Sequence, residues 1–383
     1  MEVIIIGGGA SGLTAAIVAA HSGKNVTVLE ANERVAKKLL MTGGGRCNLA
    51  NVLVDKNFYN HPDFVEGIFE SVTFDQFKEF LTNIGLFLSV PDEEGRVYPI
   101  TYTANSVVDA LRLTADRLKI KVVCSQKAVK IEKEKDKYTV FTKDASFSGD
   151  RVIISAGGNS QAQSNMLNSL ISANYVTPLC PSLAPLKVTN PPKMLNGVRL
   201  RCAITLLKND KVFCTQKGEV LFRDFGLSGI CIFNLSSFVA RDRVKRKKYR
   251  YSLSIDTLPN FSENDLQRIL SERIHLGFDL HELFVGQLHN KIAEYIIKNA
   301  TEKSPEFLAN SAKNMLFSGA APIDYSLSQV TSGGVDINYL DKNLALPNGI
   351  RVCGEAIDVD GLCGGYNLYF AFVSGIFAAK RLS

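Results

Sequence analysis

The sequence predicts an α/β protein in which a domain built on a parallel sheet is interrupted by an inserted domain of shorter strands. Three observations support this prediction. An apolar strand, a glycine-rich turn and a helix open the chain, and strand and helix patterns then alternate to about residue 186. Short strands follow from Cys180-Pro181 onward, and the first pattern returns near the C-terminus.

Composition fits an ordinary globular protein. The chain has 383 residues, which at roughly 150 residues per domain predicts two to three domains. With 46% hydrophobic and 21% charged residues, disordered, collagenous and membrane-spanning classes are excluded. The eight cysteines form no C-x-x-C pair and no grouping with His, so we expect reduced thiols, a cytoplasmic location and no metal site.

The N-terminal segment carries a nucleotide-binding pattern. A strand over residues 3–6, the sequence Gly7-Gly8-Gly9-Ala10-Ser11-Gly12 and a helix over 13–21 follow one another. In this G-x-G-x-x-G motif the first glycine permits a tight turn, the second lets a pyrophosphate approach, and the third allows close helix packing. A second strand, 25–29, ends in Glu30, whose carboxylate can accept both ribose hydroxyls and disfavours NADP. The motif does not distinguish FAD from NAD.

Three later segments also place small residues where a ligand could approach. Gly43-Gly44-Gly45 with Arg46 and Asn48 suits a backbone lying against a flat, polar or anionic ligand, and its alternative is a flexible surface loop. The strand over 152–154 ends in small residues. A helix is predicted to begin at 364–368, where its N–H groups could meet a pyrimidine carbonyl that gains charge on reduction.

These segments carry a family resemblance. The stretches are K-K-L-L-M-T-G-G-G-R-C-N (37–48), G-E-V-L-F-R-D-F-G-L-S-G (218–229), V-T-S-G-G-V (330–335) and G-E-A-I-D-V-D-G-L-C-G-G-Y-N-L (354–368). They resemble the BaiN-like FAD-dependent oxidoreductases, bacterial flavoproteins that include dehydro-bile-acid reductases and aminoacetone oxidases. The resemblance runs from Val3 to about Lys380. It implies a split Rossmann-like FAD-binding domain with an inserted β-barrel plus helical substrate domain.

The resemblance also implies site residues by position. The pyrophosphate, the adenosine ribose and the adenine would contact Gly7, Gly9, Ser11 and Gly12, then Glu30, then Val129. The ribityl chain and flavin would lie along Gly44, Arg46, Asn48, Gly354, Glu355, Tyr366, Asn367 and Leu368. The predicted cofactor-binding set further includes Ala10, Ala31, Lys38, Gly45, Ala156, Gly157, Gly158, Asp358 and Gly365. No catalytic residue and no metal ligand is assigned.

Two segments depart from the family's pattern. Arg223-Asp224 and Ile230 stand where relatives commonly carry Thr-His and Pro. Residues 159–165 replace an aromatic-Pro pair and a Gly-Ser-Thr-Gly turn. Because of the first departure, no acid/base role of a histidine is carried over to that position, and because of the second we expect the mouth of the substrate site to differ.

Domain boundaries follow from the change in pattern. The FAD-binding domain is predicted over 1–186 and 323–383, and the insertion over 187–322. Within the insertion, a β-barrel is expected over 187–258 and 305–322 and a helical lobe over 259–304. Two helices are predicted in the lobe, from Ser262 to Gly277 and over 280–296, and a third helix of the insertion begins at Pro305.

A basic segment, residues 241–250, lies inside the insertion. It holds seven Lys and Arg against one Asp, which accounts for the formal charge of +6. It could be an anion or nucleic-acid patch, or a grip on the phosphate of transient NADPH. We favour a solvated hairpin between two strands, because alternating charges suit an exposed ribbon.

The sequence thus predicts a cytoplasmic oxidoreductase that transfers a hydride through tightly bound FAD to or from a small organic substrate. An NAD(P)H-dependent reductase of an unsaturated or carbonyl-conjugated compound is favoured. With one dinucleotide fingerprint, NAD(P)H would bind only transiently. An amine oxidase of the aminoacetone type and a flavin-bound nucleic-acid or regulatory binding protein are the alternatives. A small-molecule partner is expected, with no membrane and no nucleic acid; oligomeric state is unassigned.

Overall fold

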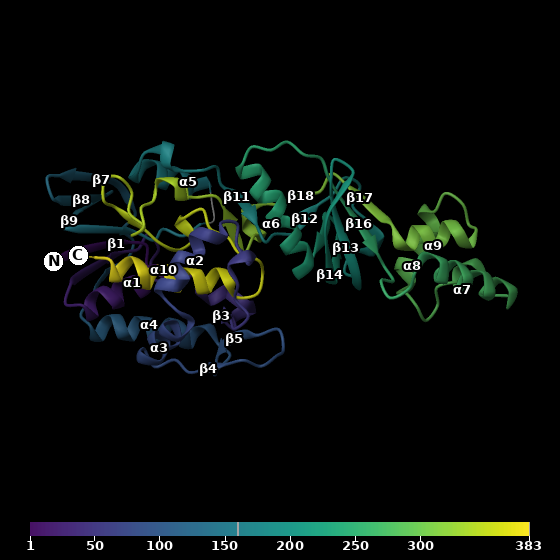
Figure 1. Ribbon diagram of the computed structural model, residues 1–383, viewed down its shortest axis with the longest axis horizontal. Helices are drawn as coiled ribbons and strands as arrows, with labels where there is room; N and C mark the ends of the chain where they lie inside the picture. Colours follow the sequence, from purple (N-terminus) through teal and green to yellow (C-terminus); the bar gives the residue numbers. More distant parts are fainter. Residues whose placement is uncertain (159–160, 383) are drawn as a thin grey trace. The chain divides into compact units, whose positions relative to one another are not determined.

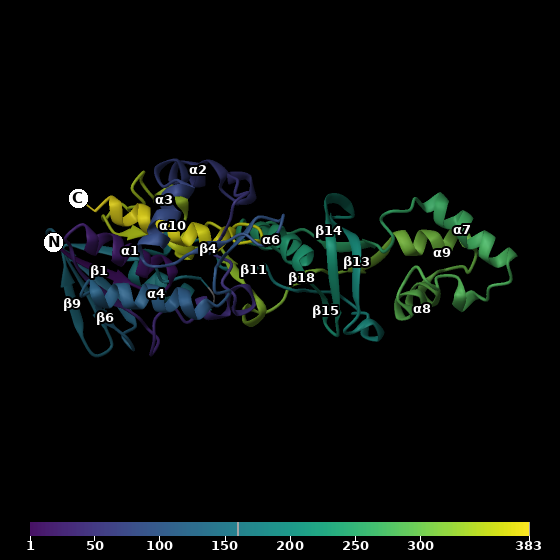
Figure 2. The ribbon, with the colours of Figure 1, turned by 90° about the horizontal axis from the view of Figure 1, so that it is seen from below.

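The computed structural model describes residues 1–158 and 161–382, without the side chains of residues 161–165 (Figures 1 and 2). Residues 159–160 and the side chains of 161–165, where the substrate-facing difference is expected, therefore lie outside the described part of the structure. The chain forms two compact units: unit 1 is Met1–Cys180 with Gln329–Ser383, and unit 2 is Pro181–Ser328. The predicted boundaries at 187 and 322 fall inside unit 2.

Unit 1 is built on a five-stranded parallel sheet in the order β20–β10–β1–β2–β6. The side chains from Val3 to Ile6 are at most 3% exposed, as expected for a central strand buried on both faces. The sheet confirms the α/β class and the Rossmann-like architecture. Its strands, in that order, are Arg351–Val352, Arg151–Ile154, Glu2–Ile6, Asn25–Leu29 and Lys121–Val123.

Helices α1 (Ala10–His21) and α10 (Tyr366–Lys380) pack against each other (Figure 1). The two helices are in close contact at Gly375, where a Cβ would lie 2.5 Å from the carbonyl oxygen of Ser11. Helix α3 (Phe74–Asn83) begins with a capping box formed by Thr73 and Gln76. The other helices of unit 1 are α2 (Pro62–Ser71), α4 (Ala104–Arg117) and α5 (Gln161–Leu170).

Unit 1 also contains two three-stranded antiparallel sheets, in the orders β3–β5–β4 and β7–β8–β9. The strands of the first, in that order, are Ala50–Asn51, Arg96–Pro99 and Leu88–Ser89, and those of the second are Ala128–Glu134, Lys137–Thr142 and Ser146–Gly149. The chain leaves unit 1 in β11 (Cys180–Ser182) and re-enters it just before β19 (Val330–Ser332), which pairs with β11 in a two-stranded sheet.

Unit 2 contains a seven-stranded sheet in the order β17–β16–β13–β14–β15–β12–β18, whose paired strands are antiparallel. The sheet has two ends, β17 and β18, so the predicted barrel is not confirmed. Between β13 and β14, Asn209 and Asp210 both have positive φ, which suits a tight hairpin turn. The strands, in sheet order, are Met315–Ser318, Tyr251–Asp256, Arg199–Lys208, Lys211–Arg223, Gly226–Ser228, Leu186–Lys187 and Ala321–Pro322.

The helices of unit 2 correct two sequence predictions. The helix expected over 280–296 is a 3₁₀ turn (Leu280–Glu282) followed by a separate helix α8, because the chain turns at Gly286 with φ of +78°. The basic segment is not a hairpin, since it begins in the last turn of helix α6 and continues as a loop to β16. The helices are α6 (Ile230–Val244), α7 (Glu263–His275), α8 (Asn290–Asn299) and α9 (Pro305–Lys313).

Two kinds of feature are absent from the described residues. No helix in this part of the chain combines the length and the hydropathy of a membrane span. The described His, Cys, Asp and Glu side chains form no group that could hold a metal ion. The eight cysteines are free thiols.

Candidate dinucleotide site

The turn after β1 has the backbone that its motif glycines require. Gly7 has φ of +108°, and a Cβ there would overlap the carbonyl oxygen of Ser155. A Cβ at Gly12 would overlap the carbonyl oxygen of Gly7. Gly9, the N-cap of α1, differs, because its Cβ would meet nothing within 4 Å. Open space therefore lies at the N-terminus of α1, where the helix dipole favours an anion.

Glu30 faces this turn from the end of β2. It is 8% exposed, and its Oε2 accepts a hydrogen bond from the backbone nitrogen of Gly8 at 2.8 Å. Its Oε1 accepts from the backbone and side-chain nitrogens of Asn32 at 2.8 and 2.6 Å. Carboxylate oxygens have further lone pairs, so Glu30 can still accept from ribose hydroxyls.

The second glycine cluster presents an open backbone. Gly43, Gly44 and Gly45 all have left-handed φ, at 57°, 65° and 84°. A Cβ at Gly44 would meet nothing within 4 Å. Nearby, the buried Oδ1 of Asn48 has no hydrogen-bond partner among the described residues. The guanidinium of Arg46 lies over the ring of Tyr98, 5.7 Å from its centroid. An open backbone beside an unsatisfied acceptor fits a polar ligand.

Glu355 joins three segments that are distant in sequence. The Nζ of Lys38 lies 2.7 Å from Oε2 of Glu355 and 3.0 Å from Oε1 of Glu355. The backbone nitrogens of Gly158 and Thr331 donate to the same carboxylate at 3.1 and 3.0 Å. The hydroxyls of Thr331 and Ser332 are buried without a partner in the described chain. These two groups are free to bond a ligand.

Helix α10 begins beside the second glycine cluster. Its N-cap, Gly365, has φ of +103°, and a Cβ there would lie 2.8 Å from Oδ1 of Asn48. The amide of Asn367 is already used, because its Oδ1 accepts from the nitrogen of Gly361 at 2.8 Å and its Nδ2 donates to that residue's oxygen at 2.9 Å. A ligand contact at Asn367 would therefore come from its backbone. Tyr366 and Leu368 are half-buried.

Asp358 is a buried acceptor. Its Oδ1 accepts from Gly333 N at 3.1 Å and from Nδ2 of Asn60 at 3.2 Å, and its Oδ2 accepts from the hydroxyl of Thr177 at 3.1 Å. The Nε2 of His61 lies 4.0 Å from Oδ2. Burial raises the pKa of Asp358, and the charge of His61 opposes that rise. These bonds fasten together loops at residues 60, 177 and 333, which indicates a structural task.

The other predicted residues are distributed around these points. A Cβ at Gly354 would lie 2.7 Å from that of Ser11, so these two predicted residues touch. Val129 lies at an irregularity of β7, outside the central sheet, and is 42% exposed. Four predicted residues are half-buried or exposed beside those already described, namely Ala10, Ala31, Ala156 and Gly157. Contact with the cofactor stays a prediction for the whole predicted set.

Sequence reasoning assigned no role to several polar residues around the site. The hydroxyl of Ser155 donates to the carbonyl oxygens of Ile6 and Gly7, at 3.0 and 2.8 Å, and so fixes the glycine turn. Thr331 and Ser332 carried only the signal of the V-T-S-G-G-V stretch. Cys47 is a buried thiol, and burial raises its pKa to about 11. The thiol therefore stays protonated at neutral pH.

These residues fit a bound FAD. Open backbone lies at Gly9 and Gly44, the buried acid Glu30 has spare acceptor capacity, and unsatisfied buried oxygens lie at Asn48 and Thr331. A glycine turn at the carboxyl end of the central strand of a parallel sheet is where dinucleotides bind. Fold and site together define a Rossmann-type, dinucleotide-binding protein.

Within that class, the chain belongs to the family described as HI0933-like protein Rossmann domain, whose model matches residues 1–381. It is 28% identical to the 3-dehydro-bile acid delta(4,6)-reductase of Clostridium scindens, over 98% of this chain and 97% of that one. It is 26% identical to the ribosomal RNA dihydrouridine synthase of Haemophilus influenzae, over 100% and 98%.

A solved structure shares the fold. The 3-ketosteroid delta1-dehydrogenase of Sterolibacterium denitrificans aligns with a TM-score of 0.51 at 11% identity, covering 99% of this chain and 98% of that one. Family and fold confirm the predicted resemblance. The chain is an FAD-dependent oxidoreductase.

Proposed function

We propose that this protein is a reductase that saturates a carbon–carbon double bond conjugated to a carbonyl group in a small organic molecule, with NAD(P)H as the hydride donor. The observation that carries the proposal is the open glycine turn at Gly9 beside the buried Glu30, which suits one tightly held dinucleotide. NAD(P)H would then bind only transiently, because the sequence contains one such fingerprint.

The names of two relatives support the type of bond. A 3-dehydro bile acid with a Δ4 double bond is a ketone conjugated to an alkene. Dihydrouridine differs from uridine by saturation of a ring double bond conjugated to a carbonyl. Both relatives match this chain over nearly its whole length, so a shared reaction type is the simplest account.

The chain's own residues would hold the cofactor and shape the site. FAD, when bound, supplies a ring that exchanges a hydride. The N-terminus of α1 at Gly9 would hold the pyrophosphate, and Glu30 the ribose. Lys38 and Glu355 fix the position of the Gly158 backbone. The first N–H groups of α10, after Gly365, would stabilise negative charge.

The overall reaction balances without another reactant. NAD(P)H loses a hydride and becomes NAD(P)⁺, one carbon of the double bond gains that hydride, and the other gains a proton from water. The carbonyl stays intact. Conjugation to the carbonyl makes the alkene an acceptor for hydride, so an isolated alkene should not react.

A second candidate keeps the chemistry and changes the substrate to a uracil base in RNA. The relative named for ribosomal RNA covers this whole chain, and the chain has a basic segment at residues 241–250. Uracil has the same conjugated arrangement of alkene and carbonyl.

Anaerobic rapid mixing tests the proposal. The purified protein is mixed with NADH or NADPH, and loss of flavin absorbance is followed; a conjugated 3-oxo-4-ene steroid is then added, with its saturated 3-ketone as the matched control. We expect bleaching by a nicotinamide and recovery of colour with the conjugated ketone only. An RNA oligomer containing uridine tests the second candidate. Bleaching by aminoacetone alone would establish the amine oxidase and refute the reductase.

A further inference from the structure

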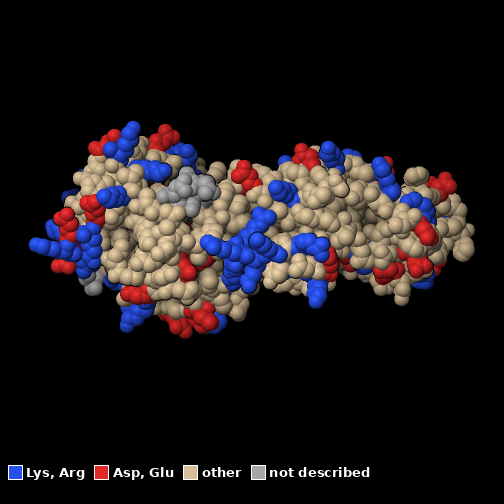
Figure 3. All heavy atoms as spheres, turned by 90° about the horizontal axis from the view of Figure 1, so that it is seen from above, with Lys and Arg blue, Asp and Glu red and all other residues tan. Residues whose placement is uncertain are grey.

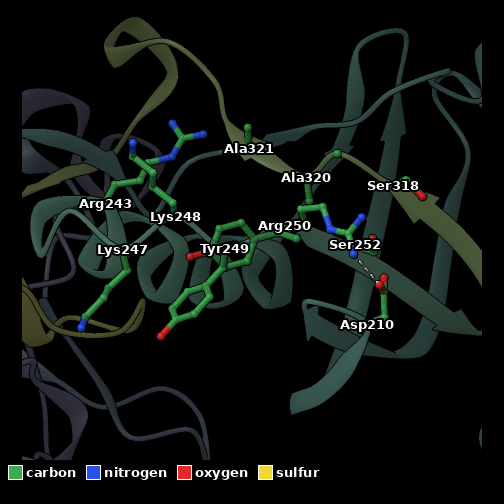
Figure 4. A pocket seen from close by; sticks show the side chains of 12 residues that line it. Asp210, Arg243, Lys247, Lys248, Tyr249, Arg250, Ser252, Ser318, Ala320 and Ala321 are labelled. Carbon is green, nitrogen blue, oxygen red and sulfur yellow. Dashed lines mark hydrogen bonds and ion pairs between the residues drawn. The ribbon is translucent and has the colours of Figure 1, made fainter.

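A cavity in unit 2 lies beside the basic segment and has a volume of about 490 Å³, within the range of ligand pockets. It forms where the loop after α6 enters β16. Figure 4 shows Arg243, Lys247 and Lys248 on one side and Asp210 with Arg250 on the other, with Tyr249 between them. Its lining is completed by Tyr251, Ser252, Ser318, Gly319, Ala320 and Ala321.

The cations of the cavity exceed its acids. Arg243, Lys247 and Lys248 are exposed, and no carboxylate of the described residues lies within the 4.0 Å of an ion pair with them. The acid in the lining, Asp210, is engaged by Arg250, with 3.1 Å between Oδ2 and Nη2. Figure 3 shows one dense group of Lys and Arg side chains among other, scattered ones on the face that it draws. The cavity is therefore positively charged.

The acid within the segment is neutralised from elsewhere. The Oδ2 of Asp242 lies 2.5 Å from the Nζ of Lys208 and accepts a hydrogen bond from the hydroxyl of Tyr251 at 3.1 Å. Lys245 and Arg246 are also exposed and continue the positive charge beyond the cavity. A row of exposed cations whose neighbouring acids are already paired suits an extended polyanion better than a single phosphate, which needs only one or two.

The basic loop is held to the β13–β14 turn. The backbone nitrogen of Asn209 donates to the carbonyl oxygen of Arg250 at 2.8 Å, and the nitrogen of Arg250 donates to Oδ1 of Asn209 at 2.9 Å. These bonds fix the backbone at Arg250, next to Tyr249, which lowers the entropic cost of ordering this end of the loop on binding.

Aromatic rings accompany the cations. Tyr249 is 40% exposed and Phe213 is 44% exposed. The Nζ of Lys208 lies 5.6 Å from the ring centre of the first and 3.4 Å from that of the second. Exposed rings beside a cationic groove are how proteins hold unpaired bases of single-stranded nucleic acid.

We propose that this cavity and residues 245–248 bind single-stranded RNA, with phosphates at Arg243, Lys247 and Lys248 and a base stacked on Tyr249. The inference goes beyond the proposed reductase, because binding is measured without turnover. RNA is favoured over DNA because this chain resembles, over its full length, a relative that acts on ribosomal RNA. NADPH is the competing ligand, and its 2′-phosphate would occupy the same cations.

Fluorescence anisotropy of a labelled oligouridine with the flavin-loaded protein tests the site. The variant R243Q/K247Q/K248Q should bind at least about tenfold more weakly, and its dependence of log K on log salt should be shallower by about two. The variant K119Q/K143Q/K342Q removes three exposed lysines of unit 1 and is the matched control, expected to bind as wild type. Thermal unfolding and flavin content verify that each variant folds.

The stacking contact is tested separately. Tyr249→Ala should weaken binding roughly fivefold or more, while Tyr249→Phe keeps the ring and the affinity. Wild-type affinity and salt slope in the triple variant, or an equal loss in the control variant, would overturn the proposal. It would also be overturned if NADPH binding depends on these three cations while RNA binding does not, or if the same oligomer made of DNA binds more tightly.

Discussion

The dinucleotide site of unit 1 and the cationic cavity of unit 2 treat charge in opposite ways. In unit 1 the acids Glu30 and Glu355 each accept several hydrogen bonds, and Lys38 lies against Glu355 at 2.7 Å. In unit 2, Arg243 and Lys247 are exposed, and neither forms an ion pair with a carboxylate of the described residues. The first arrangement fixes the backbone around a ligand of one particular shape. The second attracts anions electrostatically and places little constraint on their shape.

The contrast indicates different sensitivities. Hydrogen bonds inside a partly buried network are screened little by salt, and exposed cations are screened strongly. A ligand held in unit 1 should therefore depend on steric fit, and one held in unit 2 on ionic strength. Four substitutions, with one control variant, can break or sharpen this distinction.

The largest effect is expected from Gly9→Val. The branched side chain would fill the open space at the N-terminus of α1, so FAD should bind about a hundredfold more weakly, or about 3 kcal/mol, and the protein should purify colourless. Flavin absorbance of the purified protein measures the loss, and the unfolding temperature shows whether the fold survives. RNA binding by unit 2 should be unchanged.

Gly67→Val is the matched control, because Gly67 lies in helix α2 and its Cβ would also meet nothing within 4 Å. That variant should stay yellow. Full flavin content in the Gly9 variant would show that the pyrophosphate does not pass there.

A smaller effect is expected from Glu355→Gln. The change removes the charge that Lys38 faces and weakens the acceptor for two backbone nitrogens, so the free energy of unfolding should fall by about 2 kcal/mol. Urea unfolding of flavin-free protein measures it.

Asp210→Asn provides the comparison in unit 2. Its pair with Arg250 is exposed, with side chains 75% and 82% accessible, so the loss should stay below about 0.5 kcal/mol. Equal losses in the two variants would contradict the distinction between the units.

The last effect depends on pH. Burial raises the pKa of Asp358 above its unfolded value, and the ionisable groups that face it are His61 and Asp360. A raised carboxyl pKa stabilises the fold fully below the unfolded pKa, and that contribution is lost as pH rises through the folded pKa. Relative to Asp358→Asn, the wild type should therefore lose stability over that window, by about 1.4 kcal/mol for each pH unit that separates the folded and unfolded pKa values.

Urea unfolding of both proteins, repeated from below pH 4 to neutral pH, measures this difference. A difference that is constant with pH would show that Asp358 has the same pKa in both states. A wild type that gains stability relative to the variant as pH rises would show that the carboxylate's hydrogen bonds outweigh its desolvation.

Local sequence patterns predicted local structure well. The strand, glycine turn and helix of residues 3–21 and the helix that begins at Ser262 were predicted, because their signals lie within a few residues of one another. The prediction of one helix over 280–296 was wrong, because the apolar spacing of the sequence continues across the turn at Gly286. The prediction of a hairpin for the basic segment was also wrong, because charge alone does not distinguish a helix end from a hairpin.

By itself, the sequence determined the class of the protein. A β-branched strand, three spaced glycines and an acid after the next strand are typical of a dinucleotide-binding Rossmann fold. Only the tertiary structure decided which distant groups meet. Lys38 and Glu355 are 317 residues apart, and Asp210 and Arg250 are 40 apart. Such contacts depend on how sheets and helices pack, and no periodicity within either segment encodes its partner across the fold.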